Sequence, residues 1–153
     1  MSNTENVGNI TGRHNMVVVE FPVANGVTVN EGDFVKFASG RVTNASITGA
    51  KLVGRSQTTA TGDSGGSVSA RIECDPSTKF LIDNDETGGA AVIGDVGSYY
   101  DLTGAAGAQV IDTSTKSATT GQVVLIEVNP QVAPYSDDTS YGLYVIAESA
   151  FKL

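Results

Sequence analysis

Residues 67–74 read Ser-Val-Ser-Ala-Arg-Ile-Glu-Cys, and apolar and polar side chains alternate along the whole stretch. Successive side chains of a β-strand point to opposite faces of a sheet, so this period of two predicts a half-buried strand. The apolar face carries Val68, Ala70, Ile72 and Cys74, and the polar face carries Ser67, Ser69, Arg71 and Glu73. We therefore expect Cys74 on the core side of this strand and Glu73 on its polar side.

Segments of similar length, rich in β-branched and aromatic residues, lie on both sides of this strand and are separated by turns that contain Gly, Asn and Asp. The additional predicted strands are 16–21, 27–29, 34–37, 41–43, 51–55, 79–82, 98–102, 109–112, 122–128 and 141–146. No window shows the apolar i, i+3, i+4, i+7 repeat of an amphipathic helix. The pattern predicts an all-β protein, a compact barrel or sandwich of about ten short strands, with 16–153 as a single β domain.

Composition excludes several classes of protein. The chain has 153 residues, with 9 Lys plus Arg against 17 Asp plus Glu, which gives a net charge of −8. Nucleic-acid binding needs clustered cations, and the longest apolar runs are far shorter than a membrane helix, so we expect neither partner. No signal peptide is expected at the start of the chain. A single Cys and a single His offer no disulfide and no zinc site, and the lone thiol fits a reducing compartment.

Residues 1–15 differ from the rest of the chain because they are polar and carry only isolated apolar side chains. Such a segment buries too little surface to offset its ordering entropy by itself, so we expect a flexible N-terminal arm. Two interpretations stay open at this point. The arm is either a frayed terminus without a role, or a segment that becomes ordered against a partner.

The sequence Gly62-Asp63-Ser64-Gly65-Gly66 matches the box around the nucleophile of chymotrypsin-like serine proteases. A nucleophilic serine needs a base, and the only histidine, His14, lies 50 residues upstream without the sequence context of that family. The box also stands within a polar stretch that is typical of a hairpin loop. We therefore expect no enzyme, and a serine hydrolase that uses Ser64 remains an alternative.

Two further clusters are candidate binding sites. Asp83 and Asp85 alternate before a glycine, as in the first half of a calcium loop, but the bidentate Glu expected at the twelfth position is replaced by Gly94. We expect no cofactor, and calcium binding by Asp83 and Asp85 stays undecided. The five tyrosines could form a face that stacks on sugars, which makes a carbohydrate-binding or adhesin-type module the first alternative. They are Tyr99, Tyr100, Tyr135, Tyr141 and Tyr144.

Three segments, in this order, resemble the head decoration or capsid cement proteins of tailed bacteriophages. The first is GVTVNEGDFVKF at 26–37, the second is KLVG at 51–54 with the glycine-rich loop and VSARI at 68–72, and the third is DVGSYYDL at 95–102 leading into QVVLI at 122–126. The resemblance implies a small β-rich protein, without a catalytic signature, that binds the outside of an icosahedral shell. It also implies a homo-oligomer, with a trimer favoured, and in many members an N-terminal segment that pairs with a capsid strand.

The resulting hypothesis is a virion protein that is made in the bacterial cytoplasm and binds the major capsid protein on the outer surface of the head. It would stabilise the shell by bridging capsomers. The resemblance implies that the arm makes the capsid contact, since it occupies the corresponding place. The candidate capsid-binding residues are Ser2, Asn3, Thr4, Glu5, Asn6, Val7, Asn9, Ile10, Thr11, Arg13 and His14.

Overall fold

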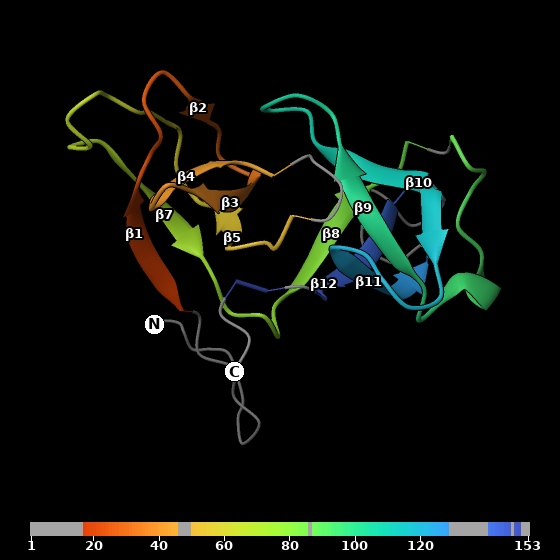
Figure 1. The fold of residues 1–153 in the computed structure, drawn as a ribbon. Coiled ribbons are helices and arrows are strands. Elements are labelled where there is room, and N and C mark those ends of the chain that lie inside the picture. Colours follow the sequence, from red (N-terminus) through yellow and green to blue (C-terminus); the bar gives the residue numbers. More distant parts are fainter. Residues whose placement is uncertain (1–16, 46–49, 86, 129–140, 148, 151–153) are drawn as a thin grey trace.

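The computed structural model describes residues 17–45, 50–85, 87–128, 141–147 and 149–150. Within these residues the protein is all-β, as predicted, with twelve strands in two five-stranded sheets and one two-stranded ribbon (Figure 1). None of the helical segments in the described residues could span a membrane. The strands are β1 (Val18–Pro22), β2 (Thr28–Val29), β3 (Phe34–Ala38), β4 (Arg41–Asn44), β5 (Gly54–Ser56), β6 (Ala60–Thr61), β7 (Ser69–Glu73), β8 (Lys79–Asp83), β9 (Tyr99–Thr103), β10 (Val110–Ser117), β11 (Val123–Val128) and β12 (Tyr141–Ile146), and η1 (Ile93–Asp95) is a short 3-10 turn.

The first sheet has the order β1-β7-β5-β3-β4 with antiparallel neighbours, and we call it the first lobe. It curls back on itself, because Val23, directly after β1, forms a parallel bridge with Val42 of β4. The Ala24 N–H donates to the Val42 carbonyl at 2.9 Å. Small and β-branched side chains fill the interior of this lobe: Val23, Val29, Val35, Val42, Val53, Ala70, Ile72 and Cys74.

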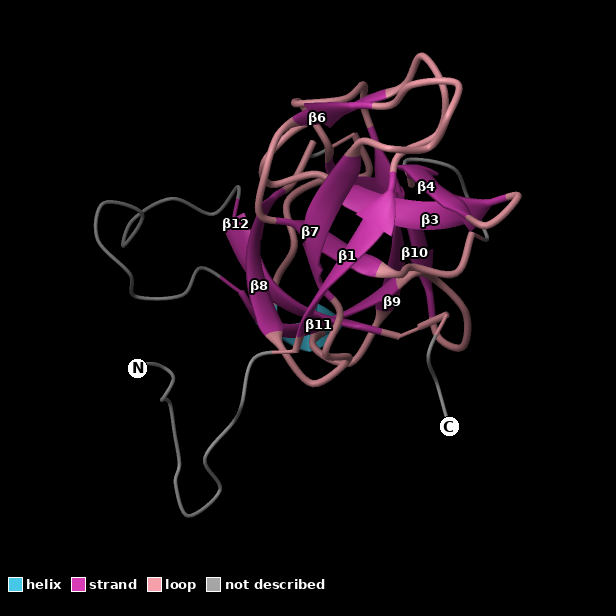
Figure 2. Cartoon of the chain, turned by 90° about the vertical axis from the view of Figure 1, so that its left-hand side faces the viewer, coloured by secondary structure: helices cyan, strands magenta, loops and turns pink. Residues whose placement is uncertain are grey.

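The second sheet has the order β10-β9-β11-β12-β8, and we call it the second lobe. It also curls, since Asn84 at the end of β8 forms a parallel bridge with Ile111 of β10. Figure 1 shows the two lobes side by side, and Figure 2 views the molecule from the side of the first lobe. They share a core, because Phe34, Ala45 and Leu52 come from the first half of the chain but pack among the large side chains of the second lobe.

Gln122 joins the two lobes by hydrogen bonds in the protein interior. Its side chain has no exposed surface. Its Oε1 accepts from the Leu102 N–H at 2.8 Å, while its Nε2 donates to the carbonyls of Ala45 and Ala50 at 3.0 Å each. Buried backbone groups need hydrogen-bond partners. The side chain of Gln122 supplies them for one N–H on a strand of the second lobe and for two carbonyls between β4 and β5 of the first lobe.

A second junction lies around Phe34 at the start of β3. The Phe34 N–H donates to Oε1 of Gln109 at 2.6 Å, and the Phe34 carbonyl accepts from Nε2 of Gln109 at 3.1 Å. Beside it, buried Asp33 accepts from the Gly107 N–H at 2.8 Å. The Arg55 guanidinium stands 5.6 Å from the centre of the Phe34 ring, and its burial lowers the pKa of Arg55 although the charge of Asp33 acts in the opposite direction.

The alternating stretch at 67–74 contains β7, and the predicted exposure of one of its side chains is wrong. Ala70, Ile72 and Cys74 are buried as expected, but Glu73 is also buried, with 4% of its surface exposed. Glu73 lies directly opposite Arg55 of β5, where the outer face of the first lobe is covered by the second lobe. Alternation along a strand shows on which face of the sheet a residue lies. It does not show that a second sheet covers part of the polar face, as it does at Glu73.

Replacing Gln122 by Met should destabilise the protein by about 2–5 kcal/mol, because one buried N–H and two buried carbonyls lose their partners. Gln109→Met is the matched comparison, since it removes two bonds to the backbone of Phe34 instead of three bonds, from a half-buried side chain, and should cost less, about 1–3 kcal/mol. Urea unfolding of both variants measures the difference. Equal losses for the two variants would contradict the junction described above.

Alkaline pH should destabilise the fold. Burial raises the pKa of Tyr100 to about 12 and raises that of Tyr144 as well. The unfolded chain loses these protons near pH 10 while the folded chain keeps them, so the contribution of the two tyrosines to stability is constant below about pH 10 and falls as the pH rises towards about 12. Urea unfolding along this pH range should show the decline, and Tyr100→Phe should make it less steep. An unchanged slope in that variant would show that Tyr100 is not responsible.

Candidate functional site: two exposed apolar surfaces

The eleven candidate capsid-binding residues, Ser2 to His14, lie outside the described residues, as does Met16. The structure therefore neither places them nor tests their role. What it does place is the point at which the N-terminal segment joins the body. The first described residue is Val17, directly before β1, and 47% of its surface is exposed.

An apolar groove of about 470 Å³ lies beside the start of β1, and we call it the β1 groove. Val19 and Phe21 point to the same face as their buried cross-strand partners Ile72 and Ala70 of β7, so the groove continues the interior of the first lobe. The residues that line it are Val17, Val19, Phe21, Cys74, Asp75 and Pro76.

The groove stays open because β1 is an edge strand of its sheet. β4 begins only at Arg41, and its bridge to Val23 lies at the far end of β1. Among the described residues, no strand pairs with the outer side of 18–22. Val19 is 38% exposed in consequence, and Phe37, which meets Phe21 edge to face at 5.2 Å, is exposed to the same extent.

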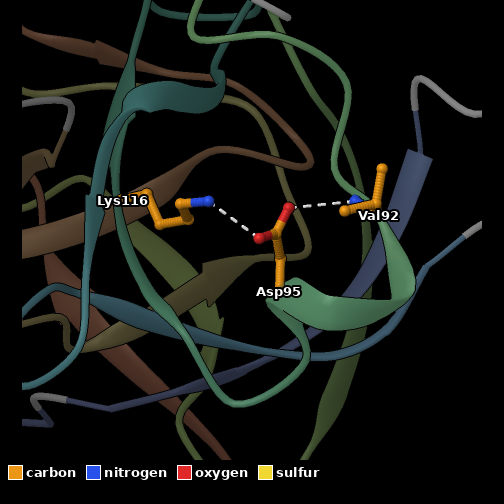
Figure 3. A network of polar contacts seen from close by, with 3 residues as sticks. All are labelled: Val92, Asp95 and Lys116. Carbon is orange, nitrogen blue, oxygen red and sulfur yellow. Dashed lines mark hydrogen bonds and ion pairs between the residues drawn. The ribbon is translucent and has the colours of Figure 1, made fainter.

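The second apolar surface is convex and belongs to the second lobe. We call it the η1 knob, and it consists of Val92, Ile93 and Val96, which are 56%, 79% and 43% exposed. The turn is held from both sides, because Asp95 accepts from the Val92 N–H at 3.0 Å and pairs with Nζ of Lys116 on β10 at 2.8 Å (Figure 3). These two contacts, the one with Lys116 foremost, lower the pKa of Asp95.

The backbone after η1 is also fixed. The Gly97 N–H donates to the Leu125 carbonyl at 2.9 Å, and the Leu125 N–H donates to the Ser98 carbonyl at 3.0 Å. The knob is therefore an ordered turn bound to β11, and its apolar side chains are exposed although the turn beneath them is rigid.

Ser64 lies exposed in the loop that joins β6 to β7, two strands of different sheets, so the predicted hairpin is wrong. Arg41 donates to the carbonyls of Asp63 and Ser64 at 2.9 and 3.2 Å. The Asp63 carboxylate accepts from the Ser67 hydroxyl at 2.6 Å and from its N–H at 2.8 Å, and these bonds lower the pKa of Asp63. The described partners of the box thus shape the loop, and His14 lies outside the described residues.

Asp85 uses both carboxylate oxygens within the fold. Oδ1 accepts from the backbone N–H groups of Thr87 and Thr113 at 3.0 Å each, and Oδ2 accepts from the Thr87 hydroxyl. These bonds attach the loop after β8 to β10. Across the part of the chain that the structure describes, no three His, Cys, Asp or Glu side chains are grouped as metal ligands would be.

The tyrosines do not form one exposed face. Tyr100 and Tyr144 are buried, and their rings meet edge to face at 6.1 Å. The Tyr144 hydroxyl donates to Oδ1 of Asn84 at 2.6 Å. Tyr99 and Tyr141 are half-buried on their strands, and Tyr135 lies outside the described residues. Two of the five residues proposed for sugar stacking therefore belong to the core.

The η1 knob is not predicted from the sequence. The available signal was the pair Val92-Ile93 in front of the turn at 94–97, where apolar residues stand next to Gly and Asp. Such a pair is more often buried than exposed, so only the structure shows that it faces solvent.

In comparisons with known proteins, no family model, no curated protein and no solved structure matches the chain.

Removing the ion pair of the knob should loosen the turn without unfolding the protein. In Lys116→Met the Val92 N–H keeps its acceptor, whereas in Asp95→Ala it loses that acceptor too, so amide exchange of Val92 should accelerate more in Asp95→Ala than in Lys116→Met. Global stability should fall by less than about 1 kcal/mol in Lys116→Met, because the pair is at the surface. Lys51→Met, at an exposed position on the first lobe, is the control. Exchange that is unchanged in both test variants would contradict the described contacts.

Proposed function

We propose that this chain is a non-enzymatic structural protein that binds the outer surface of a tailed-phage capsid and stabilises it by bridging capsomers. The major capsid protein is the proposed partner, and residues 2–15 are the proposed contact. The order of sequence segments that resembles head decoration proteins supports this proposal. In the structure it is supported by the place at which the N-terminal segment joins the body.

That place is the observation that carries the proposal. The segment joins an edge strand at half-exposed Val17, beside the open groove, and not in the middle of a sheet. A segment attached there can reach a partner without crossing the body. Extended segments bind by adding a strand to a sheet edge of the partner, where main-chain hydrogen bonds supply affinity without a demanding side-chain code.

A protein that bridges capsomers must also transmit force from one of its contact sites to another. The lobes are joined through the protein interior by Gln122 and by the bonds between Gln109 and Phe34, so the described body behaves as one unit. The carbohydrate-binding alternative is less well supported, because Tyr100 and Tyr144 are in the core. The hydrolase alternative is less well supported because the only histidine, His14, stands 50 residues upstream of Ser64 without the sequence context of that family.

Deleting residues 2–15 should abolish pelleting of the protein with expanded empty capsids while leaving its melting temperature unchanged. These residues are polar and carry only isolated apolar side chains, so we expect them to add little buried surface to the fold. Ser64→Ala is the matched control and should pellet like the unaltered chain. Full binding by the deleted protein would refute the role of the arm, and unfolding of the deleted protein would show that the arm belongs to the fold.

A further inference from the structure

The β1 groove and the η1 knob lie at opposite ends of the body. The groove belongs to the first lobe and the knob to the second, and Figure 1 places β1 and the 3-10 turn on opposite sides of the molecule. Because the lobes share a core, a knob cannot reach the groove of its own copy. One surface is hollow and the other protrudes, and both are apolar.

We propose that the η1 knob of one copy inserts into the β1 groove of a second copy, so that copies associate head to tail. The proposal is independent of the proposed function, since it concerns only contacts between copies of this chain. The proposed occupant of the groove is the turn 92–96 of another copy.

Apolar surface and rigidity favour this contact. Ile93 is more exposed than any other large apolar side chain in the described residues. A few apolar anchors that fill a pocket supply most of the binding energy of a typical interface. The turn is already held by Asp95, Lys116 and the backbone of Leu125, so docking costs little conformational entropy.

Charge selects the same orientation. With a net charge of −8, two copies repel one another in most relative orientations. Lys116 stands beside the knob and pairs with Asp95, but the side chain of Lys116 is 51% exposed whereas that of Asp95 is 13% exposed, so the ammonium group is the charge that this surface presents. The groove wall contains the carboxylate of Asp75. Insertion of the knob therefore brings a cation towards an anionic wall, whereas two grooves facing each other would bring two carboxylates together.

A contact between two different surfaces leaves each copy with one free knob or one free groove. Such heterologous contacts propagate until the chain of copies closes into a ring, or they continue as a filament. Variants that disable only one of the two surfaces can therefore complement one another, and contacts between identical surfaces cannot produce this behaviour.

Ile93→Asp should disable the knob and Val19→Asp the groove, and each full-length variant should associate at least about tenfold more weakly than the unaltered chain in sedimentation velocity. An equimolar mixture of the two variants should form a dimer, because one still has its groove and the other its knob. Val17→Asp, at a more exposed position, replaces Val19→Asp if that variant has a lower melting temperature. Ser64→Asp, beyond the other end of β7, adds the same charge as a control and should associate normally.

Cys74 gives a second measurement at the groove itself, because it lines the groove and is the only cysteine of the chain. Alkylation of Cys74 should slow as the concentration of the unaltered protein rises, and should not depend on concentration in Ile93→Asp. A monomeric unaltered chain, a mixture that stays monomeric, or alkylation that ignores concentration would each overturn the proposal.

Discussion

The arrangement of this protein depends on the need to satisfy buried backbone groups where its two curled sheets meet. Ala45 and Ala50, which lie between β4 and β5, have backbone carbonyls that reach the side chain of Gln122 in the second lobe. Gln122 supplies both of their hydrogen bonds and accepts one from β9 as well. The long side chain of Gln reaches both lobes with both ends of its amide, which no apolar residue could do. Phe34, Ala45 and Leu52 can then pack into the second lobe without leaving polar groups exposed to the core.

The sequence predicted the class of fold and most strands because their side chains alternate or because they form short β-branched runs. It did not predict how the sheets close. The bridges from Val23 to Val42 and from Asn84 to Ile111 join residues that no local pattern connects. Nor did it predict the burial of Glu73, which follows from contact between lobes and not from its own strand. Side-chain alternation is a local property, whereas closure and coverage are decided by distant parts of the chain.

The candidate site was predicted least well, for a similar reason. The most conspicuous motif, around Ser64, is hydrogen-bonded to Arg41, and Asp85 of the acidic cluster accepts from Thr87 and Thr113. The composition of both segments therefore reflects the hydrogen bonds that shape their loops. The exposed apolar surfaces have no sequence signature, because Val19 and Ile93 look like ordinary core residues until their surroundings are known. The proposed capsid contact therefore rests on the sequence of the N-terminal residues, and the proposed association of copies rests on the β1 groove and the η1 knob in the structure.

The pairing of β1 with β7 also bears on how the body responds to tension. Five consecutive residues, Val18–Pro22, are in register with Ser69–Glu73 in an antiparallel ladder. A pull transmitted through Val17 along the axis of β1 stretches all rungs of this ladder at once, in shear, and does not open them one after another. The strand that receives the N-terminal segment is therefore attached in the geometry that best resists being torn away along its length.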